Sequence, residues 1–269
     1  MSVAPARPAS AVVLVRPAGP GPAELGWETY LLRRSAQSPV LAGFWVFPGG
    51  TVRADDSRPT GALLVPRFSS ADAHAALARA PGHPPSNAEE SLAYFVTAAR
   101  ELFEEAGILL ASTDGPQPET VCQAPPEQRL AIERGRPLAE LVADLGVALA
   151  LDRLVYYGHW ITPEALPQRF DTRFFLARLL DGEAPSPSPF EMAEGLWITV
   201  EDALERARGG AFPLHFATLS HLRRLAPYRG LEDLLQFART KPVVPVMPAT
   251  GQNEGRIVPF LPPELEGTW

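Results

Sequence analysis

The stretch "AARELFEEAGILL" at 98–110 places acidic residues within an apolar pattern of helical spacing. The same apolar spacing continues upstream, so the stretch is the end of a longer amphipathic helix. Ser86, followed three residues later by Glu89, has the arrangement of an N-terminal capping box. Gly107 is a typical residue just past a helix end. The sequence therefore predicts a helix over 87–106.

Three carboxylates crowd the last turn of this predicted helix. Glu101, Glu104 and Glu105 stand at i, i+3 and i+4, which places them within about a third of the helix circumference. Like charges at this spacing repel, and anions are disfavoured at a helix C-terminus. Arg100 can pair with Glu104, but one guanidinium cannot balance three acids. Two interpretations stay open: a solvated acidic helix end, or a site for a hard divalent cation such as Mg²⁺.

A glycine pair ends the apolar run "GFWVFPGG" at 43–50. Pro-Gly-Gly after a strand is commonly only a turn. The alternative is that backbone carbonyl or amide groups of Gly49 and Gly50 approach a metal ion or a phosphate, which glycine permits sterically.

Together the two stretches resemble a known motif. "RELFEEAGI" (100–108) resembles the second half of the Nudix box, G-x5-E-x7-R-E-U-x-E-E-x-G-U, at every specified position. "FWVFPGG" (44–50) is similar to the strand and turn that open the box, with Gly50 as its first residue. Where the family has its first glutamate this chain has Asp56, and residues 57–99 stand where the family has seven residues.

The long insertion leaves the partner of Arg100 open. Loop closure entropy grows by only about 0.6 kcal/mol per doubling of length, so the insertion can leave the site intact. Asp56, Glu89 and Glu90 are the candidate partners. A box interrupted at this place is similar to the peroxisomal coenzyme A diphosphatase branch of the Nudix superfamily. Further similarities to that branch extend the resemblance over residues 10–262.

The resemblance implies a site for Mg²⁺ or Mn²⁺. Glu101, Glu104 and Glu105 would supply carboxylates, the Gly49 carbonyl a backbone ligand, and Arg100 would orient the glutamates. The implied chemistry is attack of a metal-activated water on one phosphorus of a pyrophosphate. The implied catalytic residues are Glu104, Glu101, Arg100 and a general base, for which Glu191 and Glu194 are further candidates.

Substrate contacts are less sharply indicated. Arg33, Arg34 and Gly50 could contact phosphate, although both arginines also suit an ordinary surface. Aromatic side chains could stack on an adenine or equally belong to the core; these are Tyr156, Tyr157, His159 and Trp160.

The leading function is hydrolysis of coenzyme A or an acyl-CoA to 3′,5′-ADP and (acyl-)phosphopantetheine. The alternatives are pyrophosphatase action on NADH, ADP-ribose or nucleotide triphosphates, and, in another class, a non-catalytic Nudix domain that senses a ligand.

The implied fold is α/β: a Nudix α/β/α sandwich with a mixed sheet, a helical insertion at about 57–86 lining the substrate entrance, and extra C-terminal helices. A single domain is expected over 10–262, with flexible termini at 1–9 and 263–269. Local patterns predict strands at 11–16, 27–34, 43–50, 153–162, 171–180 and 195–200, helices at 70–80, 126–145 (broken at 135–137), 201–207, 215–226 and 231–239, and a closing hairpin at 243–262.

Composition restricts the partners. The net charge of −7 argues against nucleic-acid binding, which needs a basic face, but not against a small nucleotide-type substrate. No apolar run reaches about 18 residues, so no membrane contact is expected. A single cysteine, Cys122, excludes an internal disulfide, and the histidines lack zinc-ligand spacing. The N-terminus lacks a signal-peptide pattern, which favours a cytoplasmic location. The oligomeric state is open, a homodimer being one option.

Overall fold

A mixed sheet forms the centre of the computed structural model, which describes residues 3–19, 26–57, 63–64, 66–80, 85–112, 122–253 and 255–269. In this part of the chain the sheet has eight strands, in the order β10-β7-β8-β1-β2-β3, with β4 on β1 and β9 on β2. The pairs β1–β8 and β7–β10 are parallel and the other pairs are antiparallel, which confirms the mixed sheet. The strands are β1 (Arg7–Pro17), β2 (Trp27–Arg34), β3 (Trp45–Val46), β4 (Gly49–Thr51), β7 (Val155–Ile161), β8 (Phe170–Arg178), β9 (Met192–Thr199) and β10 (Pro245–Val246).

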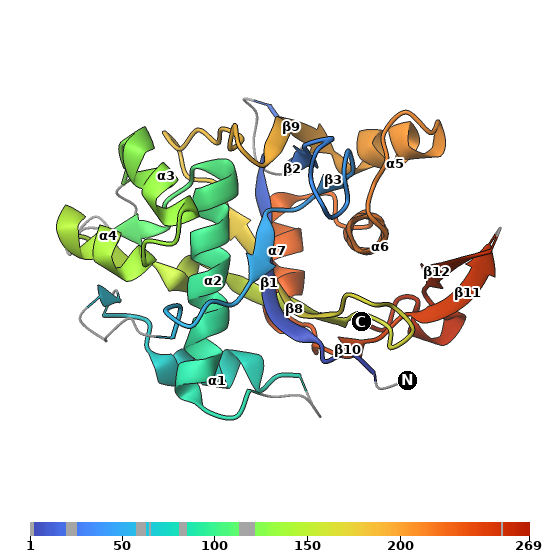
Figure 1. Cartoon of the computed structure of the whole chain (residues 1–269), viewed down its shortest axis with the longest axis horizontal. Helices are drawn as coiled ribbons and strands as arrows, with labels where there is room; N and C mark the ends of the chain where they lie inside the picture. The colour runs from blue at the N-terminus through green and yellow to red at the C-terminus, as the bar shows by residue number, and fades with distance from the viewer. Residues whose placement is uncertain are drawn as a thin grey trace.

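Helices cover both faces of this sheet (Figure 1). On one face lie α1 (Ser70–Leu77), α2 (Ala88–Ala106), α3 (Pro126–Glu133) and α4 (Leu138–Leu145). On the other lie α5 (Val200–Arg208), α6 (Phe216–Leu225) and α7 (Leu231–Thr240). Smaller elements are β5 (Ala111–Ser112), β6 (Ala148–Leu149), η3 (Leu151–Arg153), β11 (Ala249–Asn253), β12 (Arg256–Phe260) and η4 (Pro263–Leu265).

Strand β1 shows why two helical layers are needed. Val12 and Leu14 enter the core beneath α2, whereas Val13 and Val15 enter the core beneath α6 and α7. Successive strand side chains point to opposite faces, so an uninterrupted apolar strand must be buried on both. The expected α/β/α sandwich is confirmed.

Helix α2 ends at the predicted residue, but its N-cap lies one residue after the predicted one. Gly107 ends it with a left-handed backbone (φ 73°). The N-cap is Asn87, not Ser86, because the Asn87 side chain accepts a hydrogen bond from the Glu90 amide at 2.8 Å. The Ser86 amide donates instead to the Glu90 carboxylate at 2.7 Å.

Proline divides the single strand expected at 43–50. Strand β3 pairs with β2, and β4 pairs with β1. Pro48 lies between them, and its carbonyl accepts a hydrogen bond from the Val12 amide at 2.8 Å. Proline has no N–H to donate to a ladder, so the chain changes partner strand at this point. The change brings the glycine pair onto β1.

The helical insertion is present but does not line the cavity described below. Helix α1 packs on α2, with Ala73 and Leu77 in the same core as Phe95. Of the described residues between 57 and 86, none lines the cavity, so the expected place at the substrate entrance is wrong for them. Their apolar side chains are buried against α2 instead. Residues 58–62, 65 and 81–84 lie outside the described part of the chain.

Order extends into both stretches expected to be flexible. Strand β1 begins at Arg7, within 1–9, because its backbone continues the ladder with β8. Trp269, within 263–269, is 2% exposed and packs edge-on against Trp160, with ring centroids 4.9 Å apart. Burial of a large indole is a strong reason for order at that position.

The second half of the chain follows the expected pattern. The break predicted at 135–137 separates α3 from α4, and the hairpin predicted at 243–262 contains β11 and β12, which pair outside the main sheet. None of the helices in the described residues is both long enough and apolar enough to cross a membrane.

Candidate active site

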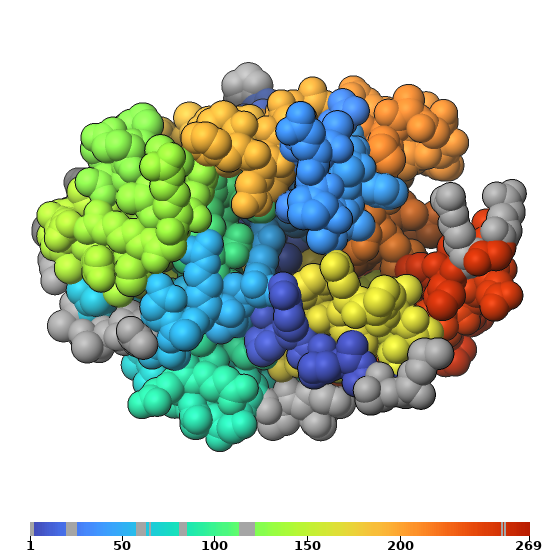
Figure 2. Space-filling model, viewed as in Figure 1, coloured from blue at the N-terminus to red at the C-terminus, as the bar shows by residue number. Residues whose placement is uncertain are grey.

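A cavity of about 530 Å³ opens between the glycine turn, the end of α2 and the second half of the chain. Figure 2 shows the hollow, bordered by residues of the blue N-terminal part and by the yellow segment after β7. One part of its wall is charged, with Glu101, Glu104, Glu105 and Glu191 beside Arg7, Arg34 and Arg53. Another part is apolar, and includes Phe47, Trp160, Phe174 and Phe216. The cavity therefore offers both ionic and apolar contacts.

The glycine pair allows α2 to approach the sheet closely. A Cβ atom on Gly50 would lie 2.3 Å from Oε1 of Glu101, and one on Gly49 would lie 2.5 Å from the Ser10 carbonyl oxygen. No larger residue fits at either position without displacing its neighbour. The Gly49 amide donates a hydrogen bond to Oε2 of Glu105 at 2.9 Å. The Gly49 carbonyl as a metal ligand stays a prediction.

Replacing Gly50 by alanine is expected to lower kcat at least about tenfold, because the added methyl group must displace the Glu101 carboxylate. The expected readout is the turnover of a pyrophosphate substrate in saturating Mg²⁺. Gly210→Ala is an unsuitable control because Gly210 has a positive φ of 76°. Gly209→Ala is the better control, since a Cβ there meets nothing closer than 3.5 Å. Equal activity of the Gly50 and Gly209 variants would contradict the close-approach argument.

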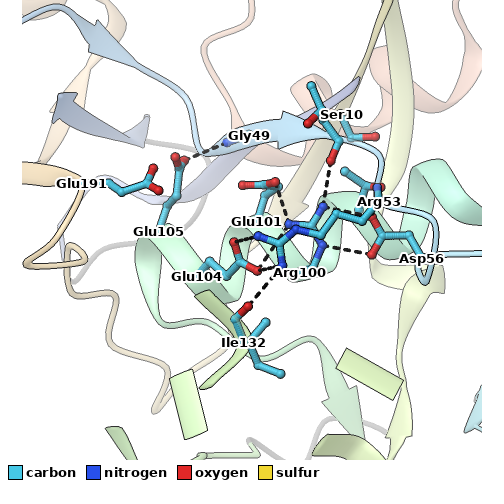
Figure 3. A network of polar contacts seen from close by, with 12 residues as sticks. Ser10, Gly49, Arg53, Asp56, Arg100, Glu101, Glu104, Glu105, Ile132 and Glu191 are labelled. Carbon is cyan, nitrogen blue, oxygen red and sulfur yellow. Dashed lines mark hydrogen bonds and ion pairs between the residues drawn. The ribbon is translucent and has the colours of Figure 1, made fainter. Parts of the chain in front are cut away.

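Arg100 is fully buried and its partner is Asp56 (Figure 3). Its Nε and Nη2 donate to the two Asp56 carboxylate oxygens, each at 2.9 Å, and Nη2 also donates to the Thr51 carbonyl at 2.9 Å. Thr97 donates to Asp56 at 2.7 Å from one turn earlier on α2. Glu89 and Glu90 belong to the first turn of α2, far from this pair. The open question of the Arg100 partner is thereby answered.

The same guanidinium holds two of the predicted metal ligands. Nη1 of Arg100 donates to Oε1 of Glu101 at 2.7 Å and to Oε1 of Glu104 at 3.3 Å. Burial opposes the charged form of Arg100, but the hydrogen bonds and charges of Asp56, Glu101 and Glu104 outweigh it and raise the Arg100 pKa. The hydrogen bonds from Arg100 are those that the orienting role requires, and the role itself stays a prediction.

Burial disfavours the ionised form of the three glutamates of the Nudix box. Glu101, Glu104 and Glu105 are each less than a tenth exposed. Burial, followed by the negative charge of Glu101, raises the pKa of Glu104 to about 7. The same two causes raise the Glu105 pKa well above its usual range, and burial also raises the Glu101 pKa. A nearby divalent cation would favour the ionised form of all three.

The raised Glu104 pKa gives a pH dependence in metal-free protein. Between the usual value of 4.5 and about 7, the folded chain keeps a proton that the unfolded chain has lost. The Glu104 contribution to stability is therefore lost as the pH rises through this window. Glutamine at position 104 does not titrate. As the pH rises across this window, the free energy of unfolding of the wild type should therefore fall relative to that of Glu104→Gln, by up to about 3 kcal/mol. Urea unfolding of both proteins in EDTA measures this difference. A pH-independent difference between the two proteins would contradict the raised pKa.

The donor set fits a hard divalent cation, although it is not a ready-made cage. Among the described residues, no three His, Cys, Asp or Glu side chains are arranged to hold a metal ion. The Glu104 carboxylate is turned to Arg53 and Arg100, and the Glu105 carboxylate to the Gly49 amide. Their oxygens nevertheless border one cavity, and carboxylate oxygen is the ligand that Mg²⁺ and Mn²⁺ prefer. An ion at Glu104 would compete with its two guanidinium partners.

Residues 6–225 match the family model described as the NUDT19 Nudix domain. The chain belongs to this Nudix family. It is 31% identical over 248 residues to the human acyl-coenzyme A diphosphatase NUDT19, covering 82% of this chain and 66% of that protein. It is 30% identical over 267 residues to the Gallus gallus protein of the same name, covering 85% and 70%. The chain thus spans about two thirds of the length of these relatives.

A solved Nudix structure has the same fold. A NUDIX hydrolase from Alicyclobacillus acidocaldarius superposes with a TM-score of 0.69 and 25% identity, covering 87% of this chain and 97% of that one. The prediction of a Nudix hydrolase of the coenzyme A diphosphatase branch is confirmed at the level of family and fold. The assignment of Asp56 to the position of the first glutamate of the Nudix box stays a prediction.

The two arginines that end β2 have side chains in different surroundings. Arg34 lines the cavity, with Nη1 3.6 Å from Oε1 of Glu105 and Nη2 3.7 Å from Oε2 of Glu191. Arg33 points away, is about half exposed, and lies 3.5 Å from Oε1 of Glu194. Adjacent strand residues face opposite sides of the sheet, so both could not reach one phosphate. Arg33 as a substrate-binding residue is wrong, and Glu194 as a base loses its support for the same reason.

Glu191 remains the candidate general base outside the Nudix box. It lies at the cavity, 59% exposed at its side chain, on the loop before β9. Glu191→Gln is expected to lower kcat about 10²-fold, the lower end of the usual range for a general base. Glu194→Gln is the matched control and should keep wild-type kcat. The comparison uses initial rates in saturating Mg²⁺, and a larger loss in the Glu194 variant would reverse the assignment.

Of the four aromatic residues considered for adenine stacking, the cavity exposes one. Trp160 lines it, whereas Tyr156, Tyr157 and His159 are core residues. The Tyr157 hydroxyl lies 2.7 Å from Nδ1 of the buried His221. Trp160 therefore belongs to the apolar wall, and the other three are buried on β7 away from the cavity.

Sequence reasoning missed Arg53, Arg7 and His215, all of which line the cavity. Arg53 makes a forked contact with Glu104, and Arg7 lies over the Phe170 ring, 5.3 Å from its centroid. Burial lowers the His215 pKa to about 4, which keeps this side chain neutral at neutral pH. Of these three residues, only Arg53 could have been found from the sequence, because it lies between the glycine pair and Asp56.

Proposed function

We propose that this Nudix domain hydrolyses the pyrophosphate bond of coenzyme A or an acyl-CoA, giving 3′,5′-ADP and (acyl-)phosphopantetheine, with Mg²⁺ or Mn²⁺ as the cofactor. The observation that carries the proposal is the wall formed by Glu101, Glu104 and Glu105 beside the glycine turn, in a chain of this family. The names of the curated relatives support the choice of an acyl-CoA substrate. A small nucleotide-type substrate in a cytoplasmic setting is part of the same proposal.

The residues of the cavity have different proposed roles in the reaction. The Glu101, Glu104 and Glu105 carboxylates would hold the divalent ion, which would supply an activated water and neutralise charge on the leaving oxygen. Arg100 fixes Glu101 and Glu104 from behind, and Asp56 fixes Arg100. Glu191 accepts the proton of the attacking water. The new P–O bond forms as the bridging P–O bond breaks, and the bridging oxygen leaves on the second phosphate.

Arg34 is the proposed contact for the reacting phosphates. Its two terminal nitrogens face Glu105 and Glu191, so its guanidinium lies between the proposed ligands and the proposed base. Guanidinium groups bind phosphate through paired charge-assisted hydrogen bonds. The apolar wall around Trp160 and Phe216 offers room for the adenine or the acyl part of the substrate.

The test is direct product analysis. The purified protein is incubated with Mg²⁺ and coenzyme A, and the products are identified by mass spectrometry. Appearance of 3′,5′-ADP together with 4′-phosphopantetheine supports the proposal. If coenzyme A stays intact while NADH, ADP-ribose or a nucleotide triphosphate is cleaved, the substrate is that other pyrophosphate compound. Tight ligand binding without any turnover would instead favour the ligand-sensing alternative, which three retained glutamates argue against.

A further inference from the structure

Arg53 is a cation built into the charged wall of the cavity (Figure 3). Its Nη1 lies 2.8 Å from Oε1 of Glu104, and its Nη2 donates to Oε2 of Glu104 at 3.0 Å. Both carboxylate oxygens are thus held by one guanidinium, in the forked geometry that gives the strongest ion pairs. Oε1 is shared with Arg100, whereas Oε2 accepts its hydrogen bond from Arg53. A divalent ion at Glu104 must compete with this fork.

The two guanidiniums at Glu104 differ in how firmly they are held. Arg100 is fully buried and also bonded to Asp56, Glu101 and Thr51, so it is fixed. The Arg53 side chain is 31% exposed, and besides Glu104 it donates to the Ile132 carbonyl at 3.1 Å.

The backbone of Arg53 is fixed although its side chain is less so. Its amide donates to Oδ2 of Asp56 at 2.9 Å. The base of the side chain therefore has a set position beside the Arg100–Asp56 pair, and rotation about the side-chain bonds alone can move the guanidinium within the cavity it lines.

We propose that Arg53 is an internal counter-cation: it occupies Glu104 while no divalent ion is bound, and on release it contacts a phosphate oxygen of the substrate. The first part rests on the fork at Glu104 alone. The second part rests on the proposed function, because it requires a pyrophosphate in the cavity. Arg53 is then a positioning residue in the free protein and a substrate contact in the complex.

The first part is tested without any substrate, by Mn²⁺ binding to the whole chain. The electron paramagnetic resonance signal of free Mn²⁺ gives the dissociation constant. Arg53→Ala should bind Mn²⁺ about fivefold more tightly than wild type, the ratio expected for losing one partly exposed competing ion pair. Arg7→Ala is the matched control, since it removes the same charge from the same cavity without a contact to Glu104. Its Mn²⁺ affinity should stay within twofold of wild type.

Two results would overturn the counter-cation role. One is an Arg53→Ala affinity equal to or weaker than wild type; the other is the same tightening in Arg7→Ala, which would reflect net charge only. Circular dichroism checks that each variant is folded. Arg53→Lys provides a second variant: it keeps the charge but loses the fork, so its Mn²⁺ affinity should lie between those of wild type and Arg53→Ala.

The second part is tested with methylenebisphosphonate, a non-hydrolysable pyrophosphate analogue, in saturating Mn²⁺. Calorimetry should show Arg53→Ala binding this probe about tenfold more weakly than wild type, because a charge-assisted contact is lost. Unchanged affinity would overturn the substrate contact. A chain that failed to hydrolyse coenzyme A would leave both measurements intact, so failure of the proposed function is distinguishable from failure of the Arg53 proposal.

Discussion

Replacing Glu104 by glutamine is expected to lower kcat for pyrophosphate hydrolysis by about 10³-fold while leaving the fold intact. Glutamine has nearly the same shape and can still accept hydrogen bonds from Arg53 and Arg100, which lie 2.8 and 3.3 Å from Oε1 of Glu104. It lacks the charge that a divalent cation needs at this wall. The loss should persist at high Mg²⁺ concentration.

The measurement is the initial rate over a range of Mg²⁺ concentrations, with thermal unfolding to confirm folding. Glu89→Gln is the matched control, because Glu89 lies in the first turn of the same helix and is exposed. Glu105→Gln should behave like Glu104→Gln. Wild-type turnover in both site variants would remove the metal-site assignment.

Replacing Arg100 by methionine should be the most destabilising single change at the site, costing about 3–5 kcal/mol in the free energy of unfolding. Asp56 is 2% exposed, and in the described part of the chain its remaining hydrogen-bond donors would be the Thr97 hydroxyl and the Arg53 amide. An unpaired charge in such a place is far more costly than the loss of a surface ion pair.

The Arg100 prediction is checked by urea unfolding of five proteins: wild type, Arg100→Met, Arg16→Met, Asp56→Asn and the double variant of Arg100 and Asp56. Arg16→Met is the control, since Arg16 is 38% exposed, pairs with Glu28 at 2.8 Å, and should lose at most about 1 kcal/mol. Adding Asp56→Asn to Arg100→Met should recover part of the loss, because the buried charge at position 56 is then gone. A double variant less stable than the sum of both single changes would contradict the pairing.

The parts of the fold that the sequence predicts are those specified by local patterns. Helix α2 follows from its apolar spacing and from Gly107, which alone supplies the left-handed residue at its end. The glycine turn is also marked locally, by Pro48 and the two glycines, although its contact with Glu101 joins distant parts of the chain. The α/β/α sandwich was implied by the family resemblance, and the order of the strands in the sheet was not predicted.

The parts that could not be predicted depend on long-range placement. Whether Asp56, Glu89 or Glu90 meets Arg100 is decided by where the insertion leaves and rejoins the site. Arg33 and Arg34 are identical residues in one strand, and only the two sheet faces distinguish them. In the sequence, Arg53 is indistinguishable from an ordinary charged loop residue. Only the fold brings the end of α2 beside it.

The parallel ladder between β1 and β8 has a consequence for how the chain folds during synthesis. Its register runs from Arg7 opposite Phe170 to Val15 opposite Arg178, so the partner strand of this edge of β1 is complete only after residue 178 has left the ribosome. Contacts of such separation in sequence form slowly, and an apolar strand with an open edge is prone to intermolecular pairing. Nascent chains of this protein should therefore depend on chaperones until the second half of the sheet has been translated.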